Sequence, residues 1–155
     1  MIITEVSTGK KLKVEIVPVE NADYNTLRTD RYFFDWSTER RYEVYKLRIL
    51  GTNDTLGLVS IERIPVEWRI HIRLLTVSVE NKGKGKKYDG IAGDLITFVA
   101  KIAVRDYAEL ACVSLRPKTQ IARHYIEKYN MTLTAVTLSI MVPEILELIN
   151  TYDHD

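Results

Sequence analysis

Alternation of apolar and polar residues predicts several β-strands in the first half of the chain. Residues 12–19 alternate in this way and end close to a proline and an asparagine, which is typical of a strand. Residues 42–50 and 55–64 flank a Gly-Thr-Asn-Asp turn, so they are expected to form a hairpin. Residues 21–36 contain capping residues and an aromatic cluster, which would suit one or two short helices.

The segment 69–80 predicts a long strand with one irregularity. Its apolar residues keep one parity and then change to the other at two adjacent leucines: Ile70, Ile72, Leu74, then Leu75, Val77 and Val79. Side chains alternate between the two faces of a strand, so a change of parity would expose half of these residues. An inserted residue, a β-bulge, restores the pattern, and we predict one here.

The second half of the chain alternates helices with strands. Apolar residues recur at helical spacing over 90–105 and again from residue 119, which predicts two amphipathic helices. The apolar run 110–115 is typical of a strand covered on both faces, and residues 133–142 also read as a strand. Pro143 suits the first position of a last helix. These elements predict an α+β fold with a mixed sheet.

Composition limits the kind of protein. A chain of 155 residues that is 46% apolar and 28% charged predicts one soluble globular domain covering 1–155. No apolar run approaches the roughly 18 residues of a membrane span, so no membrane contact is expected. The start lacks the pattern of a signal peptide and Cys112 is the single cysteine, which together predict a cytoplasmic protein. The formal net charge of +1 argues against nucleic acid as a partner.

Lysine and glycine are concentrated over residues 82–93, between the predicted long strand and the helix after it. A loop that enters a helix presents unpaired backbone N–H groups and the positive end of the helix dipole, where phosphate binds well. Two common phosphate motifs fail, because Ile91 stands where a Walker loop needs lysine and Tyr88 where the dinucleotide motif needs glycine. We therefore expect a phosphorylated ligand bound through another motif.

A third pattern fits this loop. The sequence Lys-Tyr-Asp-Gly-Ile-Ala at 87–92, followed by Leu-Ile, resembles the Arg/Gln-x-x-Gly-x-Gly/Ala pyrophosphate loop of the GNAT acetyltransferase superfamily. Residues 122–131 resemble the Ala-x-x-x-Tyr-Glu-Lys-Leu-Gly-Phe segment of the same family, and the order of elements is similar over residues 12–142. The resemblance implies a mixed, mostly antiparallel twisted sheet with a bulged fourth strand and helices on both faces.

The resemblance also implies a site for acetyl-coenzyme A as co-substrate. Main-chain amides of the loop would hold the pyrophosphate, which assigns this role to Lys87, Tyr88, Asp89, Gly90, Ile91 and Ala92. Val77 and Val79 would pair with the acetyl-pantetheine arm. The three further loop lysines would either reach the 3′-phosphate or form a solvated turn.

The chemistry implied is transfer of an acetyl group from the thioester to a primary amine, which must be neutral to attack. Glu80 lies where the family often has a glutamate that acts as the base, and Glu62 and His71 are alternatives. A tyrosine often protonates the leaving thiolate in this family, but Ile126 stands at that position here. We assign the acid to the neighbouring Tyr125, for which the alternative is a core-packing aromatic.

Two hypotheses remain for the function. The first is an acetyl-CoA-dependent N-acetyltransferase whose amine acceptor no motif selects. The second is a non-catalytic module of the same fold that binds acyl-CoA or another polyanion. The aromatic cluster within 32–36 would either line the acceptor pocket or pack as a short helical segment.

Two further expectations concern metals and assembly. Three histidines are scattered without ligand spacing, so no metal site is expected. Only about a dozen residues separate Tyr129 from Pro143, so one of the family's two last strands would be missing, very short or supplied by a partner. The apolar face of the last helix could cover that edge or the second subunit of a homodimer.

Overall fold

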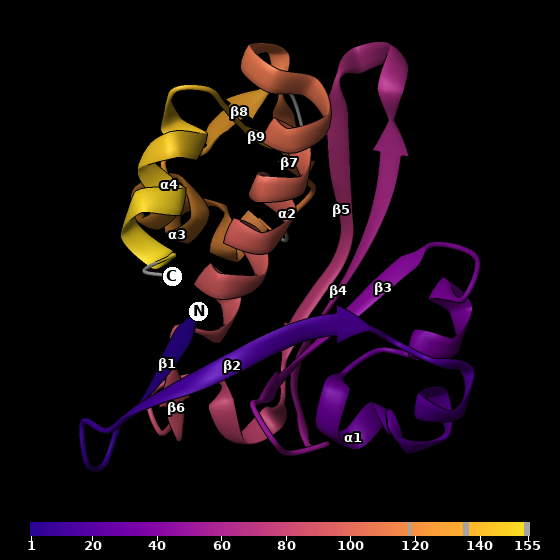
Figure 1. Cartoon of the computed structure of the whole chain (residues 1–155), viewed down its shortest axis with the longest axis vertical. Helices are drawn as coiled ribbons and strands as arrows, with labels where there is room; N and C mark the ends of the chain where they lie inside the picture. Colours follow the sequence, from indigo (N-terminus) through magenta and orange to yellow (C-terminus); the bar gives the residue numbers. More distant parts are fainter. Residues whose placement is uncertain (118, 135–136, 154–155) are drawn as a thin grey trace.

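The computed structural model describes residues 1–117, 119–134 and 137–153 (Figure 1). One sheet contains all its strands, in the order β6-β1-β2-β3-β4-β5-β7-β9-β8. The strands are β1 Ile2–Glu5, β2 Lys11–Pro18, β3 Glu43–Ile49, β4 Thr55–Ile64, β5 Arg69–Val77, β6 Tyr88–Asp89, β7 Cys112–Leu115, β8 Thr132–Thr134 and β9 Thr137–Met141. Among these strands only β5 and β7 pair in parallel, which confirms the mixed, mostly antiparallel sheet.

Helices lie on both faces of this sheet. The α-helices are α1 Thr29–Tyr32, α2 Ile91–Tyr107, α3 Thr119–Tyr129 and α4 Glu144–Tyr152. The 3-10 helices are η1 Asn21–Thr26, η2 Trp36–Glu39, η3 Pro65–Glu67, η4 Val79–Asn81 and η5 Ala108–Leu110. No helix in the described ranges combines the length and the apolar character needed to cross a bilayer.

Two apolar clusters hold these layers together. The larger one joins the buried face of α2, including Leu95 and Val99, to the sheet and to α4. The smaller one lies on the opposite face, where Tyr32 and Trp36 of the α1–η2 region pack on Val44 and Leu58. Burial of these side chains supplies the main driving force for this arrangement.

The predicted bulge is present in β5. Ser60 of β4 pairs with Leu74, whereas the next residue, Ile61, pairs with Ile72, so Arg73 is the inserted residue. The change of parity predicts the bulge at the two adjacent leucines, one residue after its observed position. The bulged strand was expected to be the fourth but is the fifth, because the sequence pattern did not predict β1. Beyond the bulge, β5 has no pairing with β7, whose ladder stops at Ile72. The two strands therefore diverge and leave one edge of β5 open.

The C-terminal part differs from its prediction in detail. The segment expected as a single strand forms the short hairpin β8–β9, in which Leu133 pairs with Leu138. Of the three alternatives for the family's last strand pair, the very short strand is the one observed. Pro143 precedes α4 as its N-cap rather than its first helical residue.

Candidate active site

The start of helix α2 faces a cavity of about 480 Å³. This space, cavity 1, lies between the lysine-rich loop, the first turn of α2 and three residues of α3: His124, Lys128 and Tyr129. The loop contributes Lys82, Lys84 and Lys86 to its wall. Cavity 1 is therefore a largely cationic space at the positive end of a helix dipole.

The first turn of α2 leaves three backbone N–H groups without a partner inside the helix. Gly90 precedes the helix with a φ of 101°, a left-handed value that glycine adopts without strain. Asp94 N donates the first helical hydrogen bond to Gly90 O over 2.9 Å. The N–H groups of Ile91, Ala92 and Gly93 therefore have no carbonyl within the helix to bond, and they are suited to an anion.

The loop before this turn is closed at its base by hydrogen bonds. Lys87 N donates to Glu80 O over 3.0 Å, and Tyr88 N donates to the side-chain oxygen of buried Asn81 over 2.8 Å. Asp89 pairs with Thr4 in the β1–β6 ladder. The amides of Lys87 and Tyr88 are thus engaged within the protein. Of the amides of residues 87–92 that were expected to hold the pyrophosphate, those in the first helical turn are the ones suited to it.

A second cavity, of about 550 Å³, follows the part of β5 beyond the bulge. Cavity 2 shares lining residues with cavity 1, so the two form one groove: Val77, Lys82, Ala92 and His124. Residues 73–77 border the groove with the strand edge that β7 leaves open. An extended ligand can hydrogen-bond to such an edge as a further strand would.

Comparison with known proteins gives relatives by structure and none by sequence. No family model matches the chain, and no curated protein matches it in sequence. The ribosomal-protein-S18-alanine N-acetyltransferase from Escherichia coli is similar in structure, with a TM-score of 0.61 at 11% identity over 84% of this chain and 94% of that one. A putative acetyltransferase of the GNAT family from Desulfovibrio desulfuricans gives a TM-score of 0.63 at 12% identity over 84% and 99%.

The spermidine/spermine N-acetyltransferase SpeG from Vibrio cholerae is similar too, with a TM-score of 0.59 at 13% identity over 87% of this chain and 96% of that one. The chain has the GNAT fold. Identity this low shows the fold alone. The resemblance drawn from the loop is confirmed at the level of the fold.

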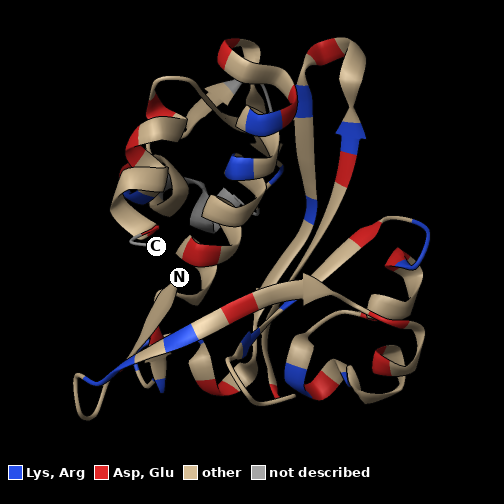
Figure 2. Cartoon of the chain, in the orientation of Figure 1, with Lys and Arg blue, Asp and Glu red and all other residues tan. Residues whose placement is uncertain are grey.

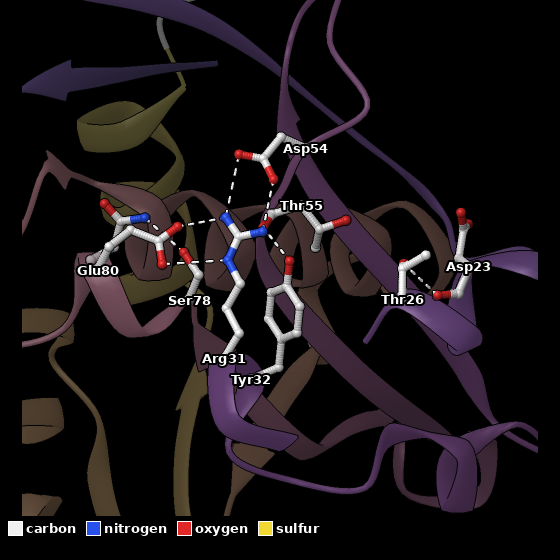
Figure 3. Close-up of polar contacts among 9 residues, drawn as sticks. Asp23, Thr26, Arg31, Tyr32, Asp54, Thr55, Ser78 and Glu80 are labelled. Carbon is white, nitrogen blue, oxygen red and sulfur yellow. Dashed lines mark hydrogen bonds and ion pairs between the residues drawn. The ribbon is translucent and has the colours of Figure 1, made fainter. Parts of the chain in front are cut away.

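Within the GNAT fold, Glu80 is the residue predicted to be the base, but it lines neither cavity. Arg31 Nη2 lies 2.6 Å from Glu80 Oε1, and Nη1 of the same arginine lies 2.8 Å from Asp54 Oδ1 (Figure 3). Partial burial would raise the pKa of Glu80, but hydrogen bonds to its carboxylate hold that pKa below its ordinary value. The hydrogen bond from Arg31 contributes most to this lowering. A carboxylate held in this way is a weak base, which disfavours Glu80 as the general base.

The remaining predicted cofactor contacts divide into two groups. Val77 lines both cavities, and the segment 88–92 lines cavity 1. Val79 instead lies in η4, is 49% exposed and lines neither cavity, because β5 ends two residues earlier. Lys87 also lines neither cavity, and its ammonium lies over the ring of Tyr88 at 5.4 Å. The contact predictions for Val79 and Lys87 are not supported by this geometry.

Tyr125 of α3, predicted as the acid, lines cavity 2. Its ring lies 5.8 Å from the ring of His124 in an edge-on arrangement and 5.8 Å from that of Tyr129. Burial raises the pKa of Tyr125, so the phenol holds its proton at neutral pH. The phenol is therefore available in cavity 2 as a hydrogen-bond donor, although the raised pKa makes it a weaker acid. Its role as the acid stays a prediction.

The alternatives for the base lie outside the groove. His71 pairs with Glu62 across β4 and β5, and its Nδ1 lies 2.9 Å from Ser114 Oγ. Burial lowers the pKa of His71, so the imidazole is neutral at physiological pH. Neither Glu62 nor His71 lines a cavity. The described walls of cavities 1 and 2 contain Asp89 as their one carboxylate, and Lys86 pairs with it at 2.8 Å.

The aromatic cluster within 32–36 was expected either to line a pocket or to pack in the core, and its residues divide between the two. Tyr32 and Trp36 are buried in the smaller apolar cluster, whereas Phe33 and Phe34 line cavity 2. Phe33 ends α1 in a left-handed conformation, with φ of 71°, which turns the chain at this point. Neighbouring aromatic residues of one short segment thus have different surroundings.

Sequence reasoning missed several residues of the groove, among them His124 and Arg116. His124 lines both cavities, and Arg116 lines cavity 2 at the end of β7. A signal existed for Arg116, because it directly follows a buried strand that ends beside the open edge of β5. His124 gave no such signal, since only the packing of α3 decides which of its faces meets the groove.

Proposed function

We propose that the protein is an N-acetyltransferase that moves an acetyl group from acetyl-coenzyme A to a primary amine. The observation that carries this proposal is the continuous groove between the free amides of the first α2 turn and the open edge of β5. The thioester donor carries a diphosphate, which would bind the free amides, and an extended arm with amide groups, which would bind the open strand edge. The low-identity acetyltransferase structures support the same assignment through the fold.

The donor would occupy the groove as follows. Its diphosphate meets the N–H groups of Ile91, Ala92 and Gly93, and the lysines of the loop supply positive charge. Lys86 already pairs with Asp89, so Lys82 and Lys84 are the better candidates for further phosphate contacts. The arm follows residues 73–77, whose backbone groups on this side lack a strand partner within the described chain.

The reaction would take place in cavity 2, next to the bulge. The amine nitrogen attacks the thioester carbonyl carbon, a C–N bond forms and the C–S bond breaks. Backbone N–H groups at the open edge of β5 stabilise the charge that develops on the carbonyl oxygen. Tyr125 donates a proton to the leaving thiolate, and the amine loses its proton to water in the groove. The tyrosinate then regains a proton from that water, which restores the starting state. This route uses no carboxylate base, because the ion pair with Arg31 makes Glu80 a weak base.

We further propose that residues 1–155 act as one catalytic domain in the reducing cytoplasm. The apolar clusters on the two sides of the sheet share β3 and β4, which supports a single folding unit. Cys112 is half-buried and burial raises the pKa of its thiol, so it is suited to packing rather than to chemistry. The homodimer stays a prediction.

One observation favours a second candidate function. The groove walls contain no unpaired carboxylate in the described chain, and the family's tyrosine position holds Ile126, which is 38% exposed. A protein that binds acyl-CoA without turning it over would keep the groove and lose these groups. Both functions predict donor binding, and only the enzyme predicts turnover.

The test combines binding with turnover. Acetyl-coenzyme A at a hundred times its dissociation constant should stabilise the fold by about 2.7 kcal/mol, read as a rise in melting temperature. An amine panel should then release free thiol and form acetylated product. Stabilisation without thiol release would favour the binding protein. No stabilisation by acetyl-coenzyme A or by coenzyme A would contradict both.

A further inference from the structure

The charged side chains that line cavity 2 are all basic. Arg73, Lys82 and Arg116 lie in its wall together with His124, and the described wall contains no aspartate or glutamate. The molecule as a whole has a net charge of only +1, and residues of both signs are spread over its elements (Figure 2). The positive charge of cavity 2 is therefore a local property.

The three cations differ in what they already contact. Arg73 Nε donates to buried Glu39 over 2.9 Å, and its guanidinium lies 3.7 Å from the ring centre of Tyr42. Lys82 lies 4.4 Å from the ring centre of Phe33 and also lines cavity 1, where the donor phosphates would attract it. Arg116 is exposed and forms no ion pair with a described carboxylate. Arg116 is thus the cation left for a ligand in cavity 2.

We propose that the acceptor is a primary amine that also carries an anionic group, a carboxylate or a phosphate, which Arg116 holds. The inference rests on the proposed acetyltransferase function and specifies its substrate class. A planar guanidinium binds either anion through two parallel hydrogen bonds. Phe33 and Phe34 would pack on the apolar part of the same molecule, on the α1 side of cavity 2.

The same charge pattern disfavours polyamine acceptors. A second or third ammonium group would lie near Lys82 and Arg116, and the described residues of the cavity wall include no carboxylate to balance it. The V. cholerae neighbour is named for spermidine and spermine, so this chain should differ from it in substrate despite the shared fold. Nearby cations also lower the pKa of the reacting amine, which helps it lose its proton without a carboxylate base.

The experiment compares matched acceptors at saturating acetyl-coenzyme A. The panel contains a free α-amino acid, the same amino acid as its amide, an aminoalkyl phosphate and spermidine. Loss of one charge-assisted contact costs roughly tenfold or more, so we expect kcat/KM for at least one anionic amine to exceed that of the neutral amide by this factor. The relative rates of carboxylate and phosphate acceptors identify the anion.

Arg116→Gln should remove this preference by raising KM for the anionic acceptor, while coenzyme A affinity is unchanged. Arg40→Gln is the matched control, because Arg40 lies over the ring of Tyr24 and lines neither cavity. Transfer to spermidine or to the amide at equal or higher kcat/KM would overturn the inference and leave the acetyltransferase intact. Transfer to none of the amines would overturn the proposed function and the inference together.

Discussion

Arg31 forms an ion pair with Glu80, the residue expected to be the base. Its guanidinium holds the carboxylates of Asp54 and Glu80 and so links α1 to the start of β4 and to η4. The sequence predicted Glu80 at the end of the long strand, but β5 ends at Val77 and Glu80 lies in η4. Its partner was not predicted, because Arg31 lies 49 residues away and no local pattern connects the two. Long-range ion pairs of this kind limit what sequence can say about a site.

Replacement of Arg31 by glutamine should lower the free energy of unfolding by about 1 kcal/mol, since it leaves two neighbouring carboxylates without their shared cation. Arg28→Gln is the matched control, because Arg28 and its partner Asp30 are both 71% exposed, and it should change stability by less than about 0.5 kcal/mol. Urea unfolding at neutral pH measures both variants. Equal stability of the two variants would contradict a structural role for Arg31.

The same pair predicts a pH dependence. The pKa of folded Glu80 lies below its ordinary value, so the pair contributes stability above the ordinary carboxyl range and loses it as the pH falls through the folded pKa. The stability difference between wild type and Arg31→Gln should therefore shrink on acidification. Melting temperatures of both proteins across the acidic range test this, and a difference that grows on acidification would contradict the assignment.

Helix α2 shows what sequence can predict at the scale of an element. Its apolar stripe and the loop before it predicted the helix and its start, and both are confirmed. Phosphate binding at this start stays a prediction. The contact that brings this start close to the sheet was not visible. Gly57 of β4 lies directly under α2, and a Cβ there would lie 2.6 Å from a methyl group of Ile91 and 2.9 Å from one of Leu95. The glycine is needed for a close approach that only the folded chain reveals.

Gly57→Ala should push α2 away from the sheet and lower stability by about 1–3 kcal/mol, the usual cost of overpacking. Gly85→Ala is the matched control, since nothing lies within 4 Å of a Cβ at that position. Chemical unfolding compares the two variants. A loss for Gly85→Ala as large as that for Gly57→Ala would show that the effect comes from glycine itself and not from the contact.

A negative charge introduced at the first turn of α2 should affect coenzyme A binding and protein stability in different ways. Ala92→Glu places a carboxylate where the donor diphosphate would lie, so coenzyme A binding should be lost. The same carboxylate is favourable at a helix N-terminus, by roughly 0.3–1 kcal/mol, so stability should be kept or raised. Ala22→Glu, at an exposed position in η1, should leave binding unchanged. Calorimetric titration measures binding, and undiminished affinity in Ala92→Glu would contradict this location of the phosphates.

At the scale of the whole molecule, the groove is assembled from segments that are distant in the chain. The aromatic pair before η2, the open edge of β5, the loop, the end of β7 and helix α3 all meet there. The order of elements predicted the fold because each element carries its own periodicity. The charge balance of cavity 2 could not be predicted, since it depends on which side chains meet across these segments. His124 is the clearest example.

The central claim is that the free amides of the first α2 turn bind the diphosphate of coenzyme A. Backbone amide NMR during titration with coenzyme A tests it most directly. The account predicts the largest shifts for Ile91, Ala92 and Gly93, with smaller ones for Lys87 and Tyr88, whose N–H groups stay bonded within the protein. Shifts in this turn no larger than those of the remote segment 21–26 would contradict it.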